Sequence, residues 1–199
     1  MQVAEGVCKH LKEAFRRRYA DSAGGNAAAD RLFAFLGVQG QAQPRDCEAR
    51  WPSGGIFAPK SSGDEELTVA RLLPVLIVAA LARPHRDHDD LWTVAGEGVP
   101  RPVNHVFRTS QASREVLLQA LRHYSTLFRI AGVFGLQEIT EADLEQYTAD
   151  VAALTSELSA NWPRETPKPP WDQIPKFHAM THLPHFVRLY GRPSNSTHR

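Results

Sequence analysis

The sequence predicts a mainly α-helical fold: an irregular helical domain built on an antiparallel helix hairpin, with long connections rich in proline and glycine. Apolar residues recur at intervals of three and four over 111–133 and again over 140–162, which is the spacing of one helix face. No segment alternates apolar and polar residues as a half-buried β-strand requires. The chain has 199 residues, 42% of them hydrophobic and 23% charged, which is typical of an ordinary globular protein.

The hairpin is the most sharply defined part of the sequence. Its first apolar stripe consists of Leu117, Leu121, Tyr124, Phe128 and Ala131, and its second consists of Leu144, Tyr147, Val151, Leu154, Leu158 and Trp162. Thr140 is followed three residues later by Asp143, which is the pattern of a capping box at a helix start. The connection between the stripes is short, so we expect the two helices to pack antiparallel, with Val151 and Leu154 against Leu121.

Residues 1–36 are expected to form two N-terminal helices. The first, over 3–19, has Val7, Leu11 and Phe15 on one face and Lys9, Lys12, Arg16 and Arg17 elsewhere. Gly24 and Gly25 end it, and a second helix over 27–36 is expected to stop at Gly37 as its C-cap glycine. The basic run 16–18 is typical of a solvated helix face, with nucleic-acid binding or nuclear import as the alternative.

Residues 37–63 are expected to be an irregular or partly disordered linker. They contain five glycines and three prolines and show no sustained period. A connection of this length inside a domain is uncommon. It either packs as an extended loop through Trp51, Ile56 and Phe57, or it stays partly disordered.

A helical domain is expected over 64–199. It opens with a helix over 65–83, in which Pro74 predicts a kink or a later start. The longest apolar run, 72–82, has eleven residues, well below the ~20 that a membrane span needs. We therefore expect a buried helix and no membrane partner.

Residues 161–175 contain five prolines and cannot form a continuous helix. We expect an extended strap, held in place by Trp162 and Trp171. A last helical element is expected to begin near Lys176.

Net charge and cysteine content limit the possible surroundings of the chain. The formal net charge is +1, so no overall field draws the chain to nucleic acid or to a membrane. Cys8 and Cys47 have neither the spacing of metal ligands nor the number that a disulfide framework requires, which predicts an intracellular, reducing environment. Charge is uneven, because 138–160 holds six acidic residues and no Lys or Arg, whereas 161–199 holds six basic residues and two acidic ones.

Three histidines near the end of the chain are the candidate metal ligands. His178 and His182 are four residues apart, which places two imidazoles on one helix face, and His185 adds a third. Pro184 disfavours an unbroken helix there, and no carboxylate or cysteine lies nearby to complete a zinc shell. Core or capping histidines are therefore favoured over a zinc site, and we expect no other cofactor.

Other chemistry has little support in the sequence. No phosphate-binding loop occurs, no small-molecule substrate is indicated, and no acid–base pair with supporting residues can be argued. Lys176, Arg188 and Arg192 are candidate phosphate contacts for nucleic acid. The acidic helix over 140–158 is typical of a solvated surface.

The segment PKFHAMTHLPHFVRLYGRP resembles a stretch of certain eukaryotic DNA transposases, the Plavaka and Kyakuja-Dileera-Zisupton kind. The family pattern runs K-F-H, a spacer, H, a spacer, I-R, two residues and G. Lys176-Phe177-His178, His182, Val187-Arg188 and Gly191 occupy those positions in order. More faintly, SGGIFAPKSSGDEELTVARLLPVL (53–76) resembles the family's T-G-x-E segment, with 62–65 in that place, so the similarity covers about residues 50–199.

The resemblance implies a relation to enzymes that cut DNA with metal-bound carboxylates on a ribonuclease-H-like core. The family continues through T-E towards its last acidic ligand, whereas His198 stands where that Glu would fall. Nothing upstream resembles the aspartate-bearing strands. We therefore carry over no catalytic residue, and we expect no enzymatic activity from this chain.

Two hypotheses remain from the sequence. In the first, the chain is a non-catalytic, transposase-derived helical fragment in the nucleus, with weak DNA association and the remainder of a transposase-like fold as its partner. In the second, it is an independent helical module that binds metal or protein through His178 and His182 or through the acidic helix over 140–158.

Overall fold

The computed structural model describes residues 2–41, 52, 56–57, 63–81, 110–133, 136, 138–165 and 167–191. The helices are α1 (Gln2–Ala23), α2 (Asn26–Gln41), α3 (Gly63–Leu81), α4 (Gln111–Gly132), α5 (Glu141–Asn161) and α6 (Pro175–Tyr190), with the 3-10 turn η2 (Trp171–Gln173) before α6. No β-strand occurs among these residues. The mainly α-helical fold that the sequence predicts is confirmed.

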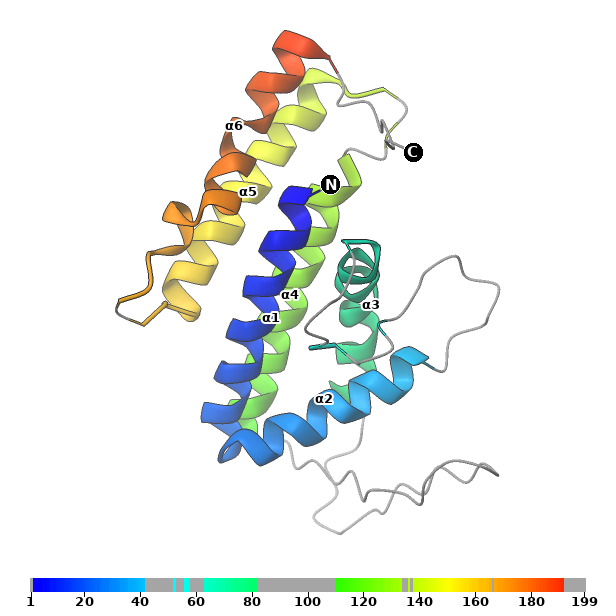
Figure 1. Ribbon diagram of the computed structural model, residues 1–199, viewed down its shortest axis with the longest axis vertical. Helices are drawn as coiled ribbons and strands as arrows, with labels where there is room; N and C mark the ends of the chain where they lie inside the picture. Colours follow the sequence, from blue (N-terminus) through cyan, green and yellow to red (C-terminus); the bar gives the residue numbers. More distant parts are fainter. Residues whose placement is uncertain are drawn as a thin grey trace.

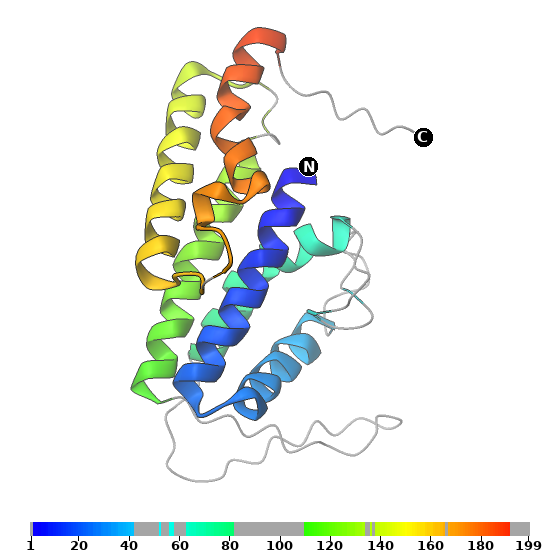
Figure 2. The same cartoon turned by 60° about the vertical axis from the view of Figure 1, so that its left-hand side comes forward.

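The helices form two four-helix groups that share α1 and α4 (Figure 1). In one group α1, α4, α5 and α6 make a closed ring of contacts, and in the other α2 and α3 close a ring with the same two helices. Neighbouring helices of the first group run in opposite directions (Figures 1 and 2). One continuous core extends from Val7 to Met180. The described residues of 1–36 and of 64–199 therefore pack around a single core.

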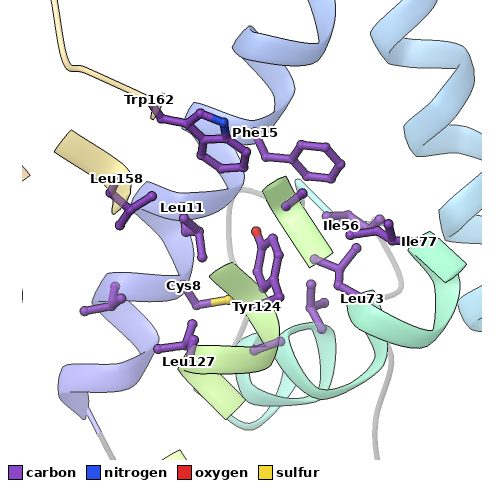
Figure 3. Close-up of a cluster of buried hydrophobic side chains, with 14 of the residues drawn as sticks. Cys8, Leu11, Phe15, Ile56, Leu73, Ile77, Tyr124, Leu127, Leu158 and Trp162 are labelled. Carbon is purple, nitrogen blue, oxygen red and sulfur yellow. The ribbon is translucent and has the colours of Figure 1, made fainter. Parts of the chain in front are cut away.

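Phe15 on α1 lies where the two groups meet (Figure 3). Its ring stacks on Trp162 at 6.0 Å and meets Phe33 of α2 edge-on at 5.0 Å. It also contacts Tyr19 and Tyr124 edge-on. Such aromatic pairs contribute about 0.5–1.5 kcal/mol each beyond the area they bury. This cluster joins α1, α2, α4 and the end of α5 into one unit.

The turn between α1 and α2 depends on two glycines. Gly24 and Gly25 have φ values of 85° and 119°, a backbone region that is costly for other residues. The predicted break is therefore confirmed. The prediction that the second helix ends at Gly37 is wrong, because α2 continues through Gly37 to Gln41. Buried Leu32, Leu36 and their neighbours hold this helix against α1 and α3, and that packing outweighs the glycine's low helix propensity.

Only part of the predicted linker 37–63 lies within the described residues. Ile56 is 3% exposed, and Phe57 packs edge-on against Phe33 at 4.7 Å. These two residues pack on the core as the extended-loop alternative expects, whereas Trp51 lies outside the described residues. α3 then begins at Gly63 and continues through Pro74, so the later helix start considered for that proline does not occur.

The hairpin of α4 and α5 is confirmed (Figure 1). The capping box is present, since Thr140 Oγ1 accepts a hydrogen bond from Asp143 N at 3.2 Å and Thr140 N donates to Asp143 Oδ2 at 2.8 Å. The predicted stripe on α4 is partly wrong, because Phe128 is 49% exposed. The buried residues of α4 are Ser113, Leu117, Ala120, His123, Tyr124, Thr126, Leu127 and Ile130. α4 contacts α1, α3 and α5, so its buried face is wider than one stripe and is displaced from the predicted one.

The segment 162–171, which we call the strap, connects α5 to η2 and α6. Trp162 and Trp171 are 1% and 2% exposed, which confirms that they hold it in place. Trp171 Nε1 donates to the carbonyl oxygen of Trp162 at 2.8 Å, and Trp162 Nε1 donates to Gln119 Oε1 at 2.8 Å. Both indole N–H groups are satisfied, so the rings are buried without an unpaired donor.

Candidate functional site

Helix α6 carries the predicted histidines on its outer side. Its buried residues are Phe177, Met180, Pro184 and Val187. Pro175 occupies the first turn, where its missing N–H does no harm. Pro184 does not interrupt the helix, so the expectation of a broken face is wrong. Pro184 is buried where α6 faces α5, and this burial offsets the lost backbone hydrogen bond.

His178, His182 and His185 are all exposed, so the prediction of core or capping positions is wrong for all three. The Nε2 atoms of His178 and His182 are 3.1 Å apart, and their ring centroids are 4.6 Å apart. At this distance one Nε2 donates a hydrogen bond and the other accepts it. His185 is not part of this pair, and its ring lies near Phe186 at 6.2 Å.

The His178–His182 pair also has the geometry of a two-nitrogen chelate. Nitrogens bound to one ion at about 2.0–2.1 Å lie about 3.4 Å apart in tetrahedral geometry and about 2.9 Å apart at a right angle. The observed 3.1 Å falls between these values. Within the described residues, no group of three or more His, Cys, Asp or Glu side chains is placed to hold a metal ion. Among the described residues the pair therefore has no further protein ligand, so its remaining metal ligands would have to come from elsewhere.

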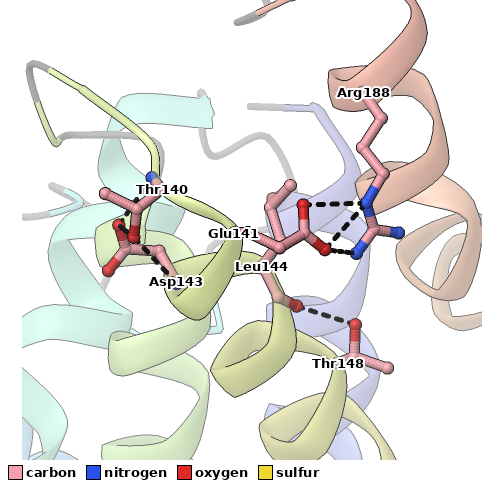
Figure 4. Close-up of polar contacts among 6 residues, drawn as sticks. All are labelled: Thr140, Glu141, Asp143, Leu144, Thr148 and Arg188. Atoms are coloured by element: carbon pink, nitrogen blue, oxygen red, sulfur yellow. Dashed lines mark hydrogen bonds and ion pairs between the residues drawn. The ribbon is translucent and has the colours of Figure 1, made fainter.

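Two of the three predicted phosphate contacts lie within the described residues, and they have different partners. Arg188 Nε donates to both carboxylate oxygens of Glu141 at 3.0 and 3.2 Å, and its Nη2 also contacts Glu141 (Figure 4). These hydrogen bonds hold the pKa of Glu141 below its usual value. A Cβ atom added to Gly6 of α1 would meet the Lys176 side chain, so that lysine lies along α1. Arg192 lies outside the described residues.

The acidic residues of α5 largely have partners. Asp143 caps the helix, Glu141 binds Arg188, and Asp150 accepts hydrogen bonds from Arg129 at 2.8 and 3.1 Å. The bonds from Arg129 lower the pKa of Asp150. The acidic stretch predicted as a working surface is thus mainly a series of capping and pairing contacts within the chain.

His123 on α4 is a buried histidine that the sequence reading missed. It is 1% exposed, and its ring meets Trp162 edge-on at 4.6 Å. Its Nδ1 lies 3.4 Å from Glu157 Oε2, but neither ring nitrogen makes a hydrogen bond within the described part of the chain. Burial, with Arg122 nearby, lowers the pKa of His123 to about 4. Glu157 is half exposed, so water weakens its attraction and burial dominates. Ala120, His123 and Leu127 share one face of the helix, and this pattern in the sequence could have indicated that His123 is buried.

A groove of about 370 Å³ runs between α5 and α6. Its floor is apolar and includes Val151, Met180 and Pro184, which are all buried. Several hydroxyl groups border it, but those of Thr148 and Thr155 donate to backbone carbonyls of their own helix at 2.8 Å. The groove is therefore an apolar depression with few free polar groups.

Comparison of the chain with protein-family models, with curated proteins and with solved structures finds no match. In the part of the chain that the structure describes, no helix combines the length and the apolar character that a membrane span requires.

Proposed function

We propose that the protein is a non-catalytic helical module of the transposase-like kind, which works in the nucleus, docks with the remainder of a transposase-like fold and associates weakly with DNA. One observation supports the proposal. Most of the segment that carries the resemblance forms helix α6, Pro175–Tyr190, which packs into the bundle. The three residues of its K-F-H motif have different surroundings. Lys176 lies along α1, Phe177 is 1% exposed and packs on Trp171 at 5.3 Å, and His178 faces solvent.

DNA association of this module would be electrostatic and sensitive to salt. The chain's net charge is only +1, and Arg188 is already engaged by Glu141. A contact that neutralises few phosphates releases few counterions, so its affinity is low and falls as salt increases.

The test is fluorescence anisotropy of a labelled DNA duplex at about 50 and about 200 mM salt. We expect weak binding at the lower salt concentration that is lost at the higher one. Glu141→Gln releases Arg188 and should tighten binding more than Glu115→Gln, which changes the net charge equally on α4 without releasing an arginine. Absence of binding at low salt, or equal effects of the two variants, would contradict DNA contact through this end of α6.

The His178–His182 distance supports a second candidate function, metal binding on the outer face of α6. Both Nε2 lone pairs are needed for a metal, so the proton now shared between the rings moves to Nδ1 or leaves. Imidazole sites prefer Cu²⁺ over Zn²⁺ and Ni²⁺, following the usual order of divalent ions.

Calorimetric titration with Cu²⁺, Ni²⁺ and Zn²⁺ tests this candidate. We expect one bound ion per chain, tightest for Cu²⁺, and loss of binding in His182→Ala. His185→Ala is the matched control, because it removes an exposed imidazole from the same helix but leaves the pair intact. Equal losses in the two variants would argue against a site at the pair.

A further inference from the structure

A small pocket of about 60 Å³ lies between α1 and the strap, away from the α6 histidines. Its walls include the two buried tryptophans of the strap, Trp162 and Trp171. At roughly 10–15 Å³ for each water, the pocket holds about four to six oxygen-sized groups. That is the size of one tetrahedral oxyanion.

Four cationic side chains line this pocket: Arg17 and Arg18 of α1, and Arg164 and Lys168 of the strap. Glu13 also lines it, and Glu165 forms an ion pair with Arg17. Four cations against these two carboxylates leave a local charge of +2, more than the +1 of the whole chain. Within the described residues, Arg18, Arg164 and Lys168 form no ion pair, so three cations remain available to a ligand.

The strap holds its part of the pocket in a fixed arrangement. Arg164 Nη1 donates to the carbonyl oxygen of Pro169 at 3.1 Å, and its guanidinium lies 5.5 Å from the centre of the Trp171 ring. Lys168 N donates to the carbonyl oxygen of Glu165 at 2.8 Å, which closes a turn. Trp171 is in turn bonded to the carbonyl of Trp162. A guanidinium fixed in this way loses little freedom when it binds an anion.

His10 also lines the pocket, and the positive charges around it act on its pKa. Its pKa is lowered by partial burial and then by Arg164, with smaller contributions from Lys9 and Lys168, while Glu13 acts in the opposite direction. The low-dielectric walls formed by the tryptophans strengthen such charge interactions. A bound anion would cancel this field, so His10 can report on occupancy.

We propose that this pocket binds one phosphate-class oxyanion, either free phosphate or the phosphate of a small phosphomonoester. The anion lies between Arg18, Arg164 and Lys168 and accepts charge-assisted hydrogen bonds from them. The proposal does not rest on the function proposed above, because the pocket lies between α1 and the strap and needs neither DNA nor a metal. Either can fail without the other.

The experiment is an NMR titration of the full chain with inorganic phosphate at constant ionic strength, followed through His10 and the two tryptophan indole N–H signals. We expect a saturable shift of these signals and a rise in the pKa of His10. A parallel titration with methyl phosphate separates the two sources. Equal binding assigns the site to phosphomonoesters as well, and binding of inorganic phosphate alone assigns it to the free anion.

Variants localise the site. Lys168→Gln and Arg18→Gln should each weaken phosphate binding by about fivefold, and Glu13→Gln should strengthen it. Arg71→Gln is the matched control, because it removes one exposed cation on α3 that is not among the residues lining the pocket. Lys168 is exposed and makes no ion pair within the described residues, so its variant should fold normally. The proposal is overturned if the signals do not saturate, or if Arg71→Gln weakens binding as much as Lys168→Gln.

Discussion

Lys12 and Glu66 form an ion pair in the interior of the protein, with Lys12 Nζ 2.7 Å from Glu66 Oε1. The two side chains are 4% and 9% exposed. Lys12 Nζ also donates to the carbonyl oxygen of Ile56 at 2.7 Å, and Cys8 Sγ donates to the carbonyl oxygen of Glu66 at 3.5 Å. Burial, with Glu66 nearby, raises the pKa of Cys8 to about 12, so this thiol stays protonated and inert at neutral pH.

Removing one partner of the Lys12–Glu66 pair should be strongly destabilising. Lys12→Met should lower the free energy of unfolding by about 3–5 kcal/mol, because it removes the cation that pairs with the buried Glu66 carboxylate. Urea denaturation measures the loss. Lys12→Met combined with Glu66→Leu should recover most of it, since the double variant removes both buried charges.

An exposed ion pair between α1 and α2 provides the control for that experiment. Arg16 Nη2 lies 2.6 Å from Asp30 Oδ1, but the two side chains are 40% and 61% exposed. Arg16→Met should therefore cost less than about 1 kcal/mol. A cost for Lys12→Met no larger than this would mean that the buried pair contributes little to stability.

His123 should make stability depend on pH in the mildly acidic range. Its pKa is about 4 in the folded protein and near 6.5 in the unfolded chain, so between these values the unfolded state binds more protons. His123 therefore contributes about 3 kcal/mol to the free energy of unfolding above pH ~6.5, and this contribution is lost as the pH falls towards 4. His123→Phe, which keeps a ring against Trp162, should remove this part of the pH dependence. The same slope in both proteins would rule out His123 as its source.

The α4–α5 interface should be sensitive to truncation at Leu154. This side chain is 1% exposed, so Leu154→Ala should cost about 2–5 kcal/mol. Phe128→Ala removes a larger side chain from α4, but that ring is 49% exposed and its loss should cost much less. Thermal and urea unfolding of the two variants compare them directly, and a reversed order would contradict the hairpin packing.

The capping box at the start of α5 should make a small, separable contribution. Thr140→Ala removes the hydroxyl that accepts from Asp143 N and should cost about 1 kcal/mol. Thr148→Ala is the control, because its hydroxyl donates to a carbonyl of its own helix, Leu144, and caps nothing (Figure 4). We expect that variant to be neutral or slightly stabilising, as measured by helix melting in far-ultraviolet circular dichroism.

Features set by local residue spacing could be predicted from the sequence. The apolar stripe of α5, the Thr140–Asp143 cap and the glycines at 24–25 act within one or two helical turns, and the structure confirms them. The stripe on α4 is confirmed only in part, because Phe128 is exposed. The helix ends were predicted wrongly where packing between helices outweighs the local preferences of glycine and proline. α2 continues through Gly37 and α6 through Pro184 because neighbouring helices bury both segments.

The candidate sites were less predictable, because they depend on residues far apart in the chain. Lys12 and Glu66 are 54 residues apart, and no local pattern marks either as buried. The cations of the phosphate pocket come from α1 and from the strap, so their convergence appears only after folding. Only the His178–His182 pair could be read directly, because an interval of four residues on a helix fixes it.

The position of α1 in both four-helix groups affects how the chain is made. Gly6 lies against Lys176, so α1 finds one of its neighbours only when α6, much further along the chain, has left the ribosome. Until then part of its apolar surface is exposed to chaperones and to other nascent chains. Folding must close this long loop before the bundle forms, so we expect its rate to be limited by chain closure rather than by helix formation. Of the described helices, α1 is synthesised before the others and is among the last to be fully covered.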